Sequence, residues 1–182
     1  MAKTAVLYQS KYGSTKLYAQ HIASILDADL FDLALSKGLD FEKYDTIVFG
    51  GGMYAGQING IKFVKSNADK LSGKNLVIFT VGIGDPAVAS NASVVLKAVN
   101  KALSKDLMKT MHIYSFRGTL DPSKLKFMHR MIMKMVISSL SKKKEEELTD
   151  DDRAMLQSLV SKVDFTNTAA TLPLIEYVST LK

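Results

Sequence analysis

Short apolar runs, rich in β-branched and aromatic residues, recur along the first two thirds of the chain. Three of them lack strict alternation with polar residues, which is typical of strands covered on both faces of a sheet. The pattern predicts five strands, at residues 4–8, 29–33, 46–49, 76–81 and 112–116. Only residues 34–45 separate the second run from the third, which leaves room for little more than a short helix.

Amphipathic segments lie between these runs. Apolar residues at three- and four-residue spacings predict helices over residues 16–26, 60–71 and 87–103, and Asn59 is the expected N-cap of the second. Strands that alternate with helices in this way indicate an α/β fold with a mostly parallel sheet.

The alternation stops after the fifth run. A Met-rich basic segment follows Pro122, Thr149 is the expected cap of a helix that ends near residue 160, and Pro173 suits the first turn of a last helix over 173–181. We therefore expect one domain, spanning residues 1–182, with an insertion at about 119–166 before its final helix. We refer to residues 119–166 as the insertion.

The amino-acid composition excludes several classes of functional site. The 182 residues include no Cys, which excludes disulfides, thiolate nucleophiles and Cys-ligated metals, and the three scattered His make a His-rich metal site unexpected. No apolar run approaches about 18 residues, so no spanning helix is expected. The chain starts directly in a strand, without a basic and apolar leader, so we expect a cytoplasmic protein.

The net charge of +6 is local rather than general. Seven basic residues and no acidic ones lie between Lys124 and Lys144. Such a strip indicates either an anionic partner or a solvated face. The cations are interleaved with Met and Ile rather than with stacking aromatics, so nucleic-acid binding is not predicted.

The turn after the first strand carries the strongest signal for chemistry. It reads Ser10, Lys11, Tyr12, Gly13, Ser14, Thr15 and opens a helix. A helix N-terminus offers free N–H groups and the positive end of its dipole, and hydroxyls add donors, so this turn suits a phosphate. The alternative is an ordinary strand–helix turn with a capping hydroxyl.

Two further glycine-bearing loops come directly after strands. Residues 50–56 after the third strand bracket Tyr54, a candidate ring platform, and residues 82–85 after the fourth have Gly at alternate positions. Because the carboxyl ends of parallel strands share one edge, the three loops predict a single site there. Dinucleotide-binding and P-loop glycine patterns are absent from the sequence.

These residues resemble the flavodoxin-type FMN proteins, whose phosphate loop reads hydroxyl-x-x-Gly-x-Thr. The resemblance implies a flavodoxin-like, doubly wound five-stranded parallel sheet in the order 2-1-3-4-5, and FMN as cofactor. It implies phosphate contacts from Ser10, Tyr12, Gly13, Ser14 and Thr15, and a ring flanked by Gly52, Met53, Tyr54, Gly82, Ile83, Gly84 and Asp85. The expected cofactor-binding set also includes Lys11, Gly51, Ala55, Gly56 and Val81. Since the flavin carries the chemistry, no catalytic side chain and no metal ligand is assigned. This chain departs from the family in its charge. Most electron-carrier flavodoxins are strongly acidic, whereas this chain is basic, with a net charge of +6.

The segment from Arg117 through the Met-rich stretch at 127–135 is similar in character to the insertion of menaquinone-dependent protoporphyrinogen oxidases. That similarity implies a flavin-dependent oxidoreductase with a quinone acceptor, in which His129 and Arg130 would contact an anionic substrate. The alternative is a flavodoxin-type electron-transfer protein that docks an acidic redox partner through its basic insertion. A third hypothesis is a module that has lost FMN and serves in binding or regulation.

The basic segment itself has three interpretations. As a helix it would place one wide apolar face opposite a basic ridge formed by Lys126, Arg130 and Lys134. The apolar face comprises Leu125, Met128, Met131, Ile132, Met135 and Val136. It would pack on the domain, or contact a membrane surface through Leu125 to Lys144 at the inner membrane face, or cover the flavin as a lid. The charged block at 142–147 is expected to be a solvated helix face or turn with internal ion pairs.

Overall fold

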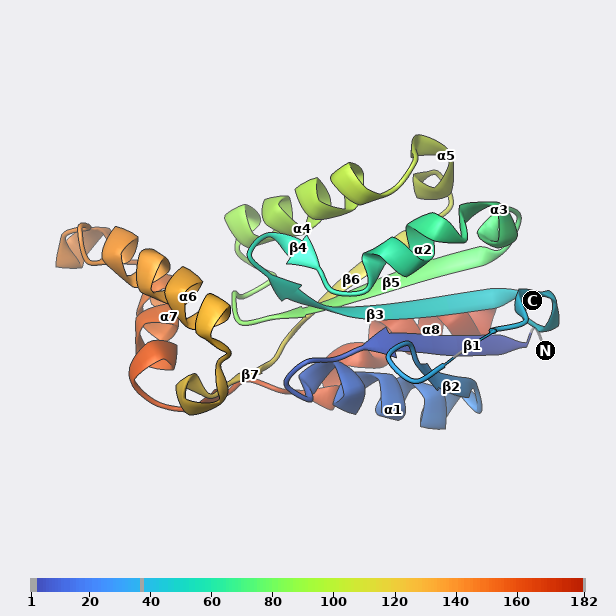
Figure 1. Cartoon of the computed structure of the whole chain (residues 1–182), viewed down its shortest axis with the longest axis horizontal. Coiled ribbons are helices and arrows are strands. Elements are labelled where there is room, and N and C mark those ends of the chain that lie inside the picture. The colour runs from blue at the N-terminus through green and yellow to red at the C-terminus, as the bar shows by residue number, and fades with distance from the viewer. Residues whose placement is uncertain (1–2, 37, 182) are drawn as a thin grey trace.

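Five parallel strands form the centre of the molecule, in the order β2-β1-β3-β5-β6 (Figure 1). The computed structural model describes residues 3–36 and 38–181. It confirms the predicted doubly wound α/β fold, the five parallel strands and their order. The strands are β1 (Thr4–Gln9), β2 (Asp29–Asp32), β3 (Thr46–Tyr54), β5 (Asn75–Gly82) and β6 (His112–Arg117).

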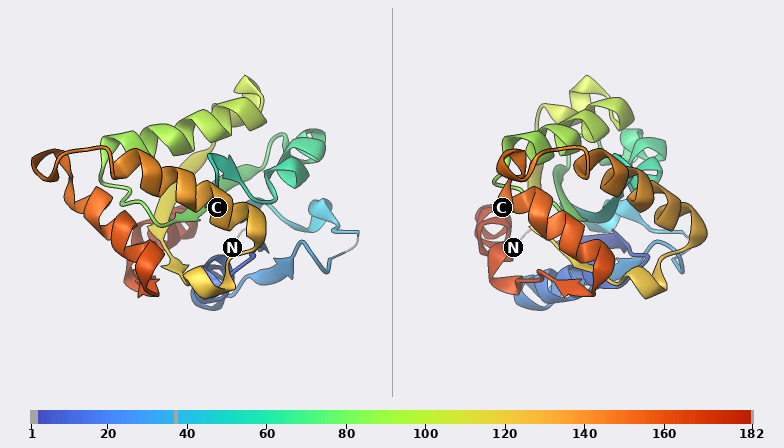
Figure 2. Two further views of the ribbon diagram at one scale, coloured as in Figure 1. Left: turned by 60° about the vertical axis from the view of Figure 1, so that its left-hand side comes forward. Right: turned by 90° about the vertical axis from the view of Figure 1, so that its left-hand side faces the viewer.

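Helices cover both faces of this sheet (Figures 1 and 2). One face carries α1 (Ser14–Leu26) and α8 (Leu172–Thr180), and the other carries α2 (Ile61–Ser66), α3 (Ala68–Leu71), α4 (Ala89–Ala102) and α5 (Lys105–Met108). Successive strand residues point to opposite faces, so Ile47 and Phe49 join one core while Val48 joins the other. The two apolar cores hold the sheet rigid, and its carboxyl edge is a fixed platform for the loops that leave the strands.

Strand β3 is longer than the sequence indicates and absorbs most of the predicted glycine loop. Gly50, Gly51 and Gly52 pair with β5, and only Ala55 and Gly56 form a turn, into the short β4 (Gln57–Ile58). A Cβ on Gly50 would overlap the ring of Phe79, and one on Gly51 would lie 2.5 Å from the backbone oxygen of Asn59. The first two glycines therefore make room for protein neighbours, which corrects their prediction as loop residues.

The helix predicted over 60–71 is also corrected. It is two short helices, α2 and α3, that meet at Asn67, and the residue before α2 is Gly60 with a φ of 82°. The expected cap, Asn59, instead donates from Nδ2 to the backbone oxygen of Gln9 at 3.3 Å. An asparagine that bonds across to β1 cannot satisfy the helix N-terminus, and the chain enters the helix through a left-handed glycine.

The insertion leaves and rejoins the sheet region at one place. Strands β7 (Thr119–Leu120) and β8 (Val163–Asp164) pair antiparallel at its base. Between them, α6 (Phe127–Leu140) and α7 (Asp150–Val160) project beyond the carboxyl edge of the sheet (Figures 1 and 2). The prediction that Thr149 caps a helix is confirmed, because its Oγ1 accepts the Asp152 N–H at 3.1 Å.

Tyr18 of α1 holds the two ends of the insertion together. Its side chain is fully buried and stacks on Phe116, with ring centroids 5.0 Å apart. The hydroxyl donates to the backbone oxygen of Arg117 at 2.7 Å and accepts the Asn167 N–H at 2.9 Å. One phenol thus links the chain just before the insertion to the chain just after it.

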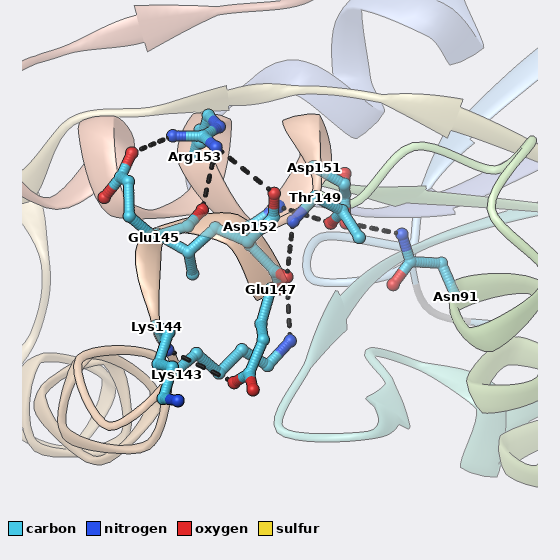
Figure 3. A network of polar contacts seen from close by, with 10 residues as sticks. Asn91, Lys143, Lys144, Glu145, Glu147, Thr149, Asp151, Asp152 and Arg153 are labelled. Atoms are coloured by element: carbon cyan, nitrogen blue, oxygen red, sulfur yellow. Dashed lines mark hydrogen bonds and ion pairs between the residues drawn. The ribbon is translucent and has the colours of Figure 1, made fainter.

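The charged block at 142–147 pairs differently from the expectation. Lys143 donates to the Asp152 carboxylate at 2.8 Å, and Arg153 pairs with Glu145, so the partners belong to α7 rather than to the block itself (Figure 3). These contacts fix the connection between α6 and α7. Within the described parts of the chain, no helix combines the length and apolar character that crossing a bilayer requires.

Gly50→Ala tests the close approach of β3 to Phe79. We expect it to lower the free energy of unfolding by about 1–3 kcal/mol, because the added methyl overlaps a buried ring. Gly82→Ala is the matched control, since a Cβ there would contact Met53 at an ordinary 3.5 Å. Urea denaturation measures both. Combining Gly50→Ala with Phe79→Leu should lower stability by less than the sum of the two single changes, and strict additivity would contradict the proposed overlap.

Candidate functional site

The N-terminus of α1 is an uncapped anion cradle. Gly13 stands at the N-cap with a φ of 104°, no described side chain caps the helix, and its first turn contains no acid. The Gly13 N–H donates to Ser10 Oγ at 3.1 Å, which closes the turn, and the Thr15 side chain is buried beneath it. The free N–H groups of the first turn, with the dipole behind them, are donors suited to a phosphate.

The insertion begins directly against this cradle. Ser14 Oγ accepts the Thr119 N–H at 2.9 Å, and a Cβ on Gly118 would lie 3.1 Å from the same oxygen. The Ser14 hydroxyl is therefore already used to hold β7 in place. Gly118 permits this close contact, so the phosphate-type turn and the base of the insertion form one unit.

A cavity of about 420 Å³ lies beyond the carboxyl ends of β1, β3 and β5. All three predicted loops contribute to its lining. The predicted site residues that line it are Tyr12, Ser14, Thr15, Met53, Tyr54, Ala55, Gly56, Val81, Gly82, Ile83 and Gly84. Sequence reasoning thus identified three separate loops that the fold brings to one space.

Six predicted site residues lie around this cavity rather than on its wall. They are Ser10, Lys11, Gly13, Gly51, Gly52 and Asp85. Lys11 places its Nζ 5.0 Å from the ring centroid of Tyr54, and Gly51 and Gly52 are buried within β3. For these six residues, as for the eleven on the wall, the role of direct ligand contact is a prediction.

A second cavity of about 330 Å³ adjoins the first on the side of the phosphate-type turn. The two share Tyr12, Ser14 and Thr119. Lys124 and Lys162 from the insertion line this second space together with Gly13, and so do the carboxylates of Asp121 and Asp164. No sequence pattern points to Lys162, which β8 brings beside a turn that lies about 150 positions earlier.

Helix α6 covers the larger cavity, but with a different face from the predicted one. Leu125, Ile132 and Val136 line the cavity as part of the expected apolar face, joined by His129 and Met133. The other expected members, Met128, Met131 and Met135, point outward and are 68%, 46% and 70% exposed. The wide stripe inferred from spacing is therefore two apolar faces, and only one of them contacts the domain.

An aromatic cluster joins α6 to two of the loops. The rings of Tyr54 and His129 are nearly parallel, at an interplanar angle of 6° with centroids 5.1 Å apart. Tyr12 Oη lies 2.6 Å from His129 Nδ1 and accepts the Lys126 N–H at 3.3 Å. One hydrogen bond thus joins the Tyr12 hydroxyl to the His129 ring, with the tautomer of the imidazole deciding which of the two atoms donates.

Local charge and burial keep this cluster neutral. Burial, followed by the cations of Lys11 and Lys126, lowers the pKa of His129 below its usual value. Burial raises the pKa of Tyr54 to about 12. Near pH 7 the cavity wall therefore presents an uncharged phenol and an uncharged imidazole, with the Lys11 ammonium behind the phenol ring.

The loop at 82–85 is held from two sides. Arg117 Nε donates to the backbone oxygen of Ile83 at 3.1 Å, from β6. From α7, Asp151 accepts the Asp85 N–H through one carboxylate oxygen and the Asn91 amide through the other, both at 2.8 Å. Figure 3 shows the contact with Asn91. Sequence reasoning missed Asp151, because its partners lie at least 60 positions away.

The chain matches one protein family and is similar to several solved structures. The model of one protein family, described as the flavodoxin domain, matches residues 5–147. No curated protein shows significant similarity to the chain. Similar solved structures include a flavodoxin, WrbA-like protein from Agrobacterium tumefaciens, at 16% identity and a TM-score of 0.46, covering 88% of this chain and 95% of that one.

Two other solved structures are similar to this chain at comparable levels of sequence identity. Oxidised flavodoxin 1 from Bacillus cereus is 15% identical, with a TM-score of 0.44, and the match covers 87% of this chain and 97% of that one. A flavoprotein in complex with FMN from Lactobacillus acidophilus is 17% identical, with a TM-score of 0.43 and coverage of 64% and 93%.

Asp151→Ala tests the clamp on the loop at 82–85. Loss of two hydrogen bonds to a carboxylate should raise the exchange rate of the Asp85 amide roughly tenfold, which corresponds to about 1–2 kcal/mol of local stability. Native-state hydrogen exchange measures this. Asp150→Ala removes the neighbouring carboxylate of the same helical turn and should leave the amide protected. Equal exchange in both variants would contradict the clamp.

The His129 ring should titrate below its ordinary pKa of 6.5, and NMR of its ring protons measures this directly. Replacing both Lys11 and Lys126 by Met should raise the midpoint toward 6.5, because two cations are removed while burial remains. Lys16→Met serves as the control. Since a lowered pKa means that folding favours neutral imidazole, this contribution to stability is full above pH 6.5 and is lost as the pH falls through the lowered pKa of His129. A midpoint at or above 6.5 would contradict this account.

Proposed function

The chain belongs to the flavodoxin domain family, and from this premise we propose that it is an FMN-dependent oxidoreductase whose insertion encloses the reactive ring. The observation that carries the proposal is the cavity at the carboxyl edge, lined by three loops of the sheet and covered by α6. A plain carrier needs the loops, but it has no need of a helix over the ring.

The residues present fit FMN. The uncapped first turn of α1 and the Thr15 hydroxyl offer neutral donors for the phosphate. Lys124 and Lys162 lie in the adjoining cavity, where the carboxylates of Asp121 and Asp164 offset their charge. The stacked pair of Tyr54 and His129 would form an aromatic wall beside the ring, and the backbone of residues 82–84 offers polar groups at its edge. Bound FMN would supply the electron transfer, since its ring both accepts and releases electrons.

The chain's own residues would then bind, orient and exclude water. Leu125, Ile132 and Val136 exclude water from the covered side of the cavity. Tyr54 stays protonated near pH 7, so its phenol adds no negative charge beside the ring. His129 lies on the cavity wall as a neutral imidazole, where it is able to form a hydrogen bond with a substrate.

For the substrate we propose a flat, largely apolar molecule. Apolar side chains from α4, α6 and α7, among them Val95, Met133 and Met155, line the cavity where such a molecule would lie. This chemistry, together with the character of the insertion, supports a protoporphyrinogen oxidase-like reaction with a quinone acceptor. Arg130 is exposed on the outside of α6, so of the two residues expected to contact an anionic substrate only His129 is positioned to do so.

The alternative is a flavodoxin-type carrier that docks an acidic redox partner. The exposed cations Lys126, Arg130 and Lys134 favour it, since they form a row on the outer side of the insertion. The position of α6 over the cavity argues against the carrier, because the helix would keep a protein partner away from that side of the ring.

The first test is the visible absorption spectrum after FMN is added and the excess removed. We expect a retained flavin. Thr15→Val should weaken the affinity roughly tenfold by removing a hydroxyl donor to the phosphate, as measured by quenching of flavin fluorescence. Thr180→Val, on the distant α8, is the control. A folded protein that retains no flavin would overturn the proposal.

The second part of the test uses the flavin-loaded protein. Oxidation of protoporphyrinogen with a menaquinone analogue as acceptor would support the enzyme. Absence of turnover with either compound, combined with electron transfer to an acidic protein that falls steeply with salt, would establish the carrier instead.

A further inference from the structure

The outer face of α6 exposes four large apolar side chains. Phe127, Met128, Met131 and Met135 are 74%, 68%, 46% and 70% exposed. Three of them recur at four-residue intervals, and Met128 lies beside the row, so they form one stripe along the helix axis. We call these four residues the outer stripe.

Cations run alongside the outer stripe. Lys126, Arg130 and Lys134 repeat at the same interval and are exposed, and no acid occurs between positions 124 and 144. Among the described residues, no carboxylate forms a salt bridge with any of the three. The row of cations is thus available to an anionic partner along the full length of the stripe.

The arrangement places this surface at one end of the molecule. Figures 1 and 2 show α6 and α7 beyond the carboxyl edge of the sheet, with the sheet and its other helices on the inner side of α6. The 14-residue helix is about 21 Å long. Leu125, just before the helix, and the inner residues Ile132 and Val136 line the cavity, whereas the outer stripe is exposed.

We propose that the outer stripe and its flanking cations dock on the surface of an anionic lipid bilayer. Phe and Met side chains on one line enter the boundary between headgroups and acyl chains, while cations beside them meet lipid phosphates. An acidic protein would match the cations but gains less from four exposed apolar side chains. The cations and the outer stripe together match a lipid bilayer whose headgroups are anionic and whose interior is apolar.

This docking goes beyond the proposed function and does not depend on it. It rests on the outside of α6, whereas the flavin site uses the inside. If both hold, the covered cavity lies one helix away from the lipid, where an apolar quinone is dissolved. The helix would then be the partition between the lipid and the site.

Co-sedimentation with vesicles tests the proposal. The full chain should bind vesicles of phosphatidylcholine that contain phosphatidylglycerol, and bind vesicles of phosphatidylcholine alone much more weakly. Replacing Met131 and Met135 by Gln should weaken binding roughly tenfold or more, because apolar contact is lost. Replacing Lys126 and Lys134 by Gln should weaken it about fivefold for each cation.

Matched controls separate this surface from general stickiness. Ile25→Gln with Leu35→Gln removes two apolar side chains that are 59% and 82% exposed elsewhere on the molecule. Lys97→Gln with Lys101→Gln removes two exposed cations from α4. Both control pairs should bind vesicles as the parent does, and urea denaturation should show that every variant remains folded.

Three results would overturn the proposal. The first is no binding to anionic vesicles, and the second is equal weakening in the α6 variants and the controls. The third is a dimer in sedimentation equilibrium that the Met131→Gln, Met135→Gln variant dissociates, since a second copy would then cover the stripe. Vesicle binding is measured with and without added FMN, so that a failure to bind flavin is distinguished from a failure to bind lipid.

Discussion

The reversal of strand order at β1 is the constraint on which the rest of the molecule depends. After β1 the chain turns into α1 on one face of the sheet, and after β3 it turns toward α2 on the other. Two loops that leave neighbouring strands toward opposite faces necessarily part, and a crevice opens between them. The uncapped start of α1, the turn at Ala55 and Gly56, and the loop after β5 all face this crevice because they have no other edge on which to end.

The sequence was sufficient wherever the determinants are local. Apolar runs predicted the five strands, Thr149 predicted the start of α7, and the turn at Ser10 to Thr15 predicted an open helix N-terminus. The sequence was not sufficient where a contact with a residue far along the chain determines the local structure. Gly50 is a glycine because of Phe79, and Asn59 does not cap because its amide bonds to Gln9. Helical spacing detected that α6 is apolar, yet it could not say which apolar residues face the cavity, because that depends on where β7 directs the helix.

The two helices of the insertion are attached to the rest of the domain by two different kinds of interaction. On the side of the phosphate-type turn, α6 is attached through stacked and hydrogen-bonded neutral rings, Tyr12, Tyr54 and His129. On the other side, α7 is attached through the Asp151 carboxylate to backbone and amide donors. Stacking and charge-assisted hydrogen bonds respond differently to pH, so the two attachments need not release together. Residues that decide access to the site are thus placed in the insertion, outside the part of the chain that forms the sheet.

Tyr18 fixes the junction at which the insertion joins the rest of the fold. Its hydroxyl holds the departing Arg117 and the returning Asn167 within hydrogen-bond reach of one oxygen, beside the β7–β8 pair. A segment whose ends already meet adds little entropy of closure when it grows, since that term rises only with the logarithm of its length. Changes of length in the middle of the segment therefore need not open the junction or the sheet. The covering helices can vary to suit a new substrate as long as the contacts of Thr119, His129 and Asp151 with the loops of the site are kept.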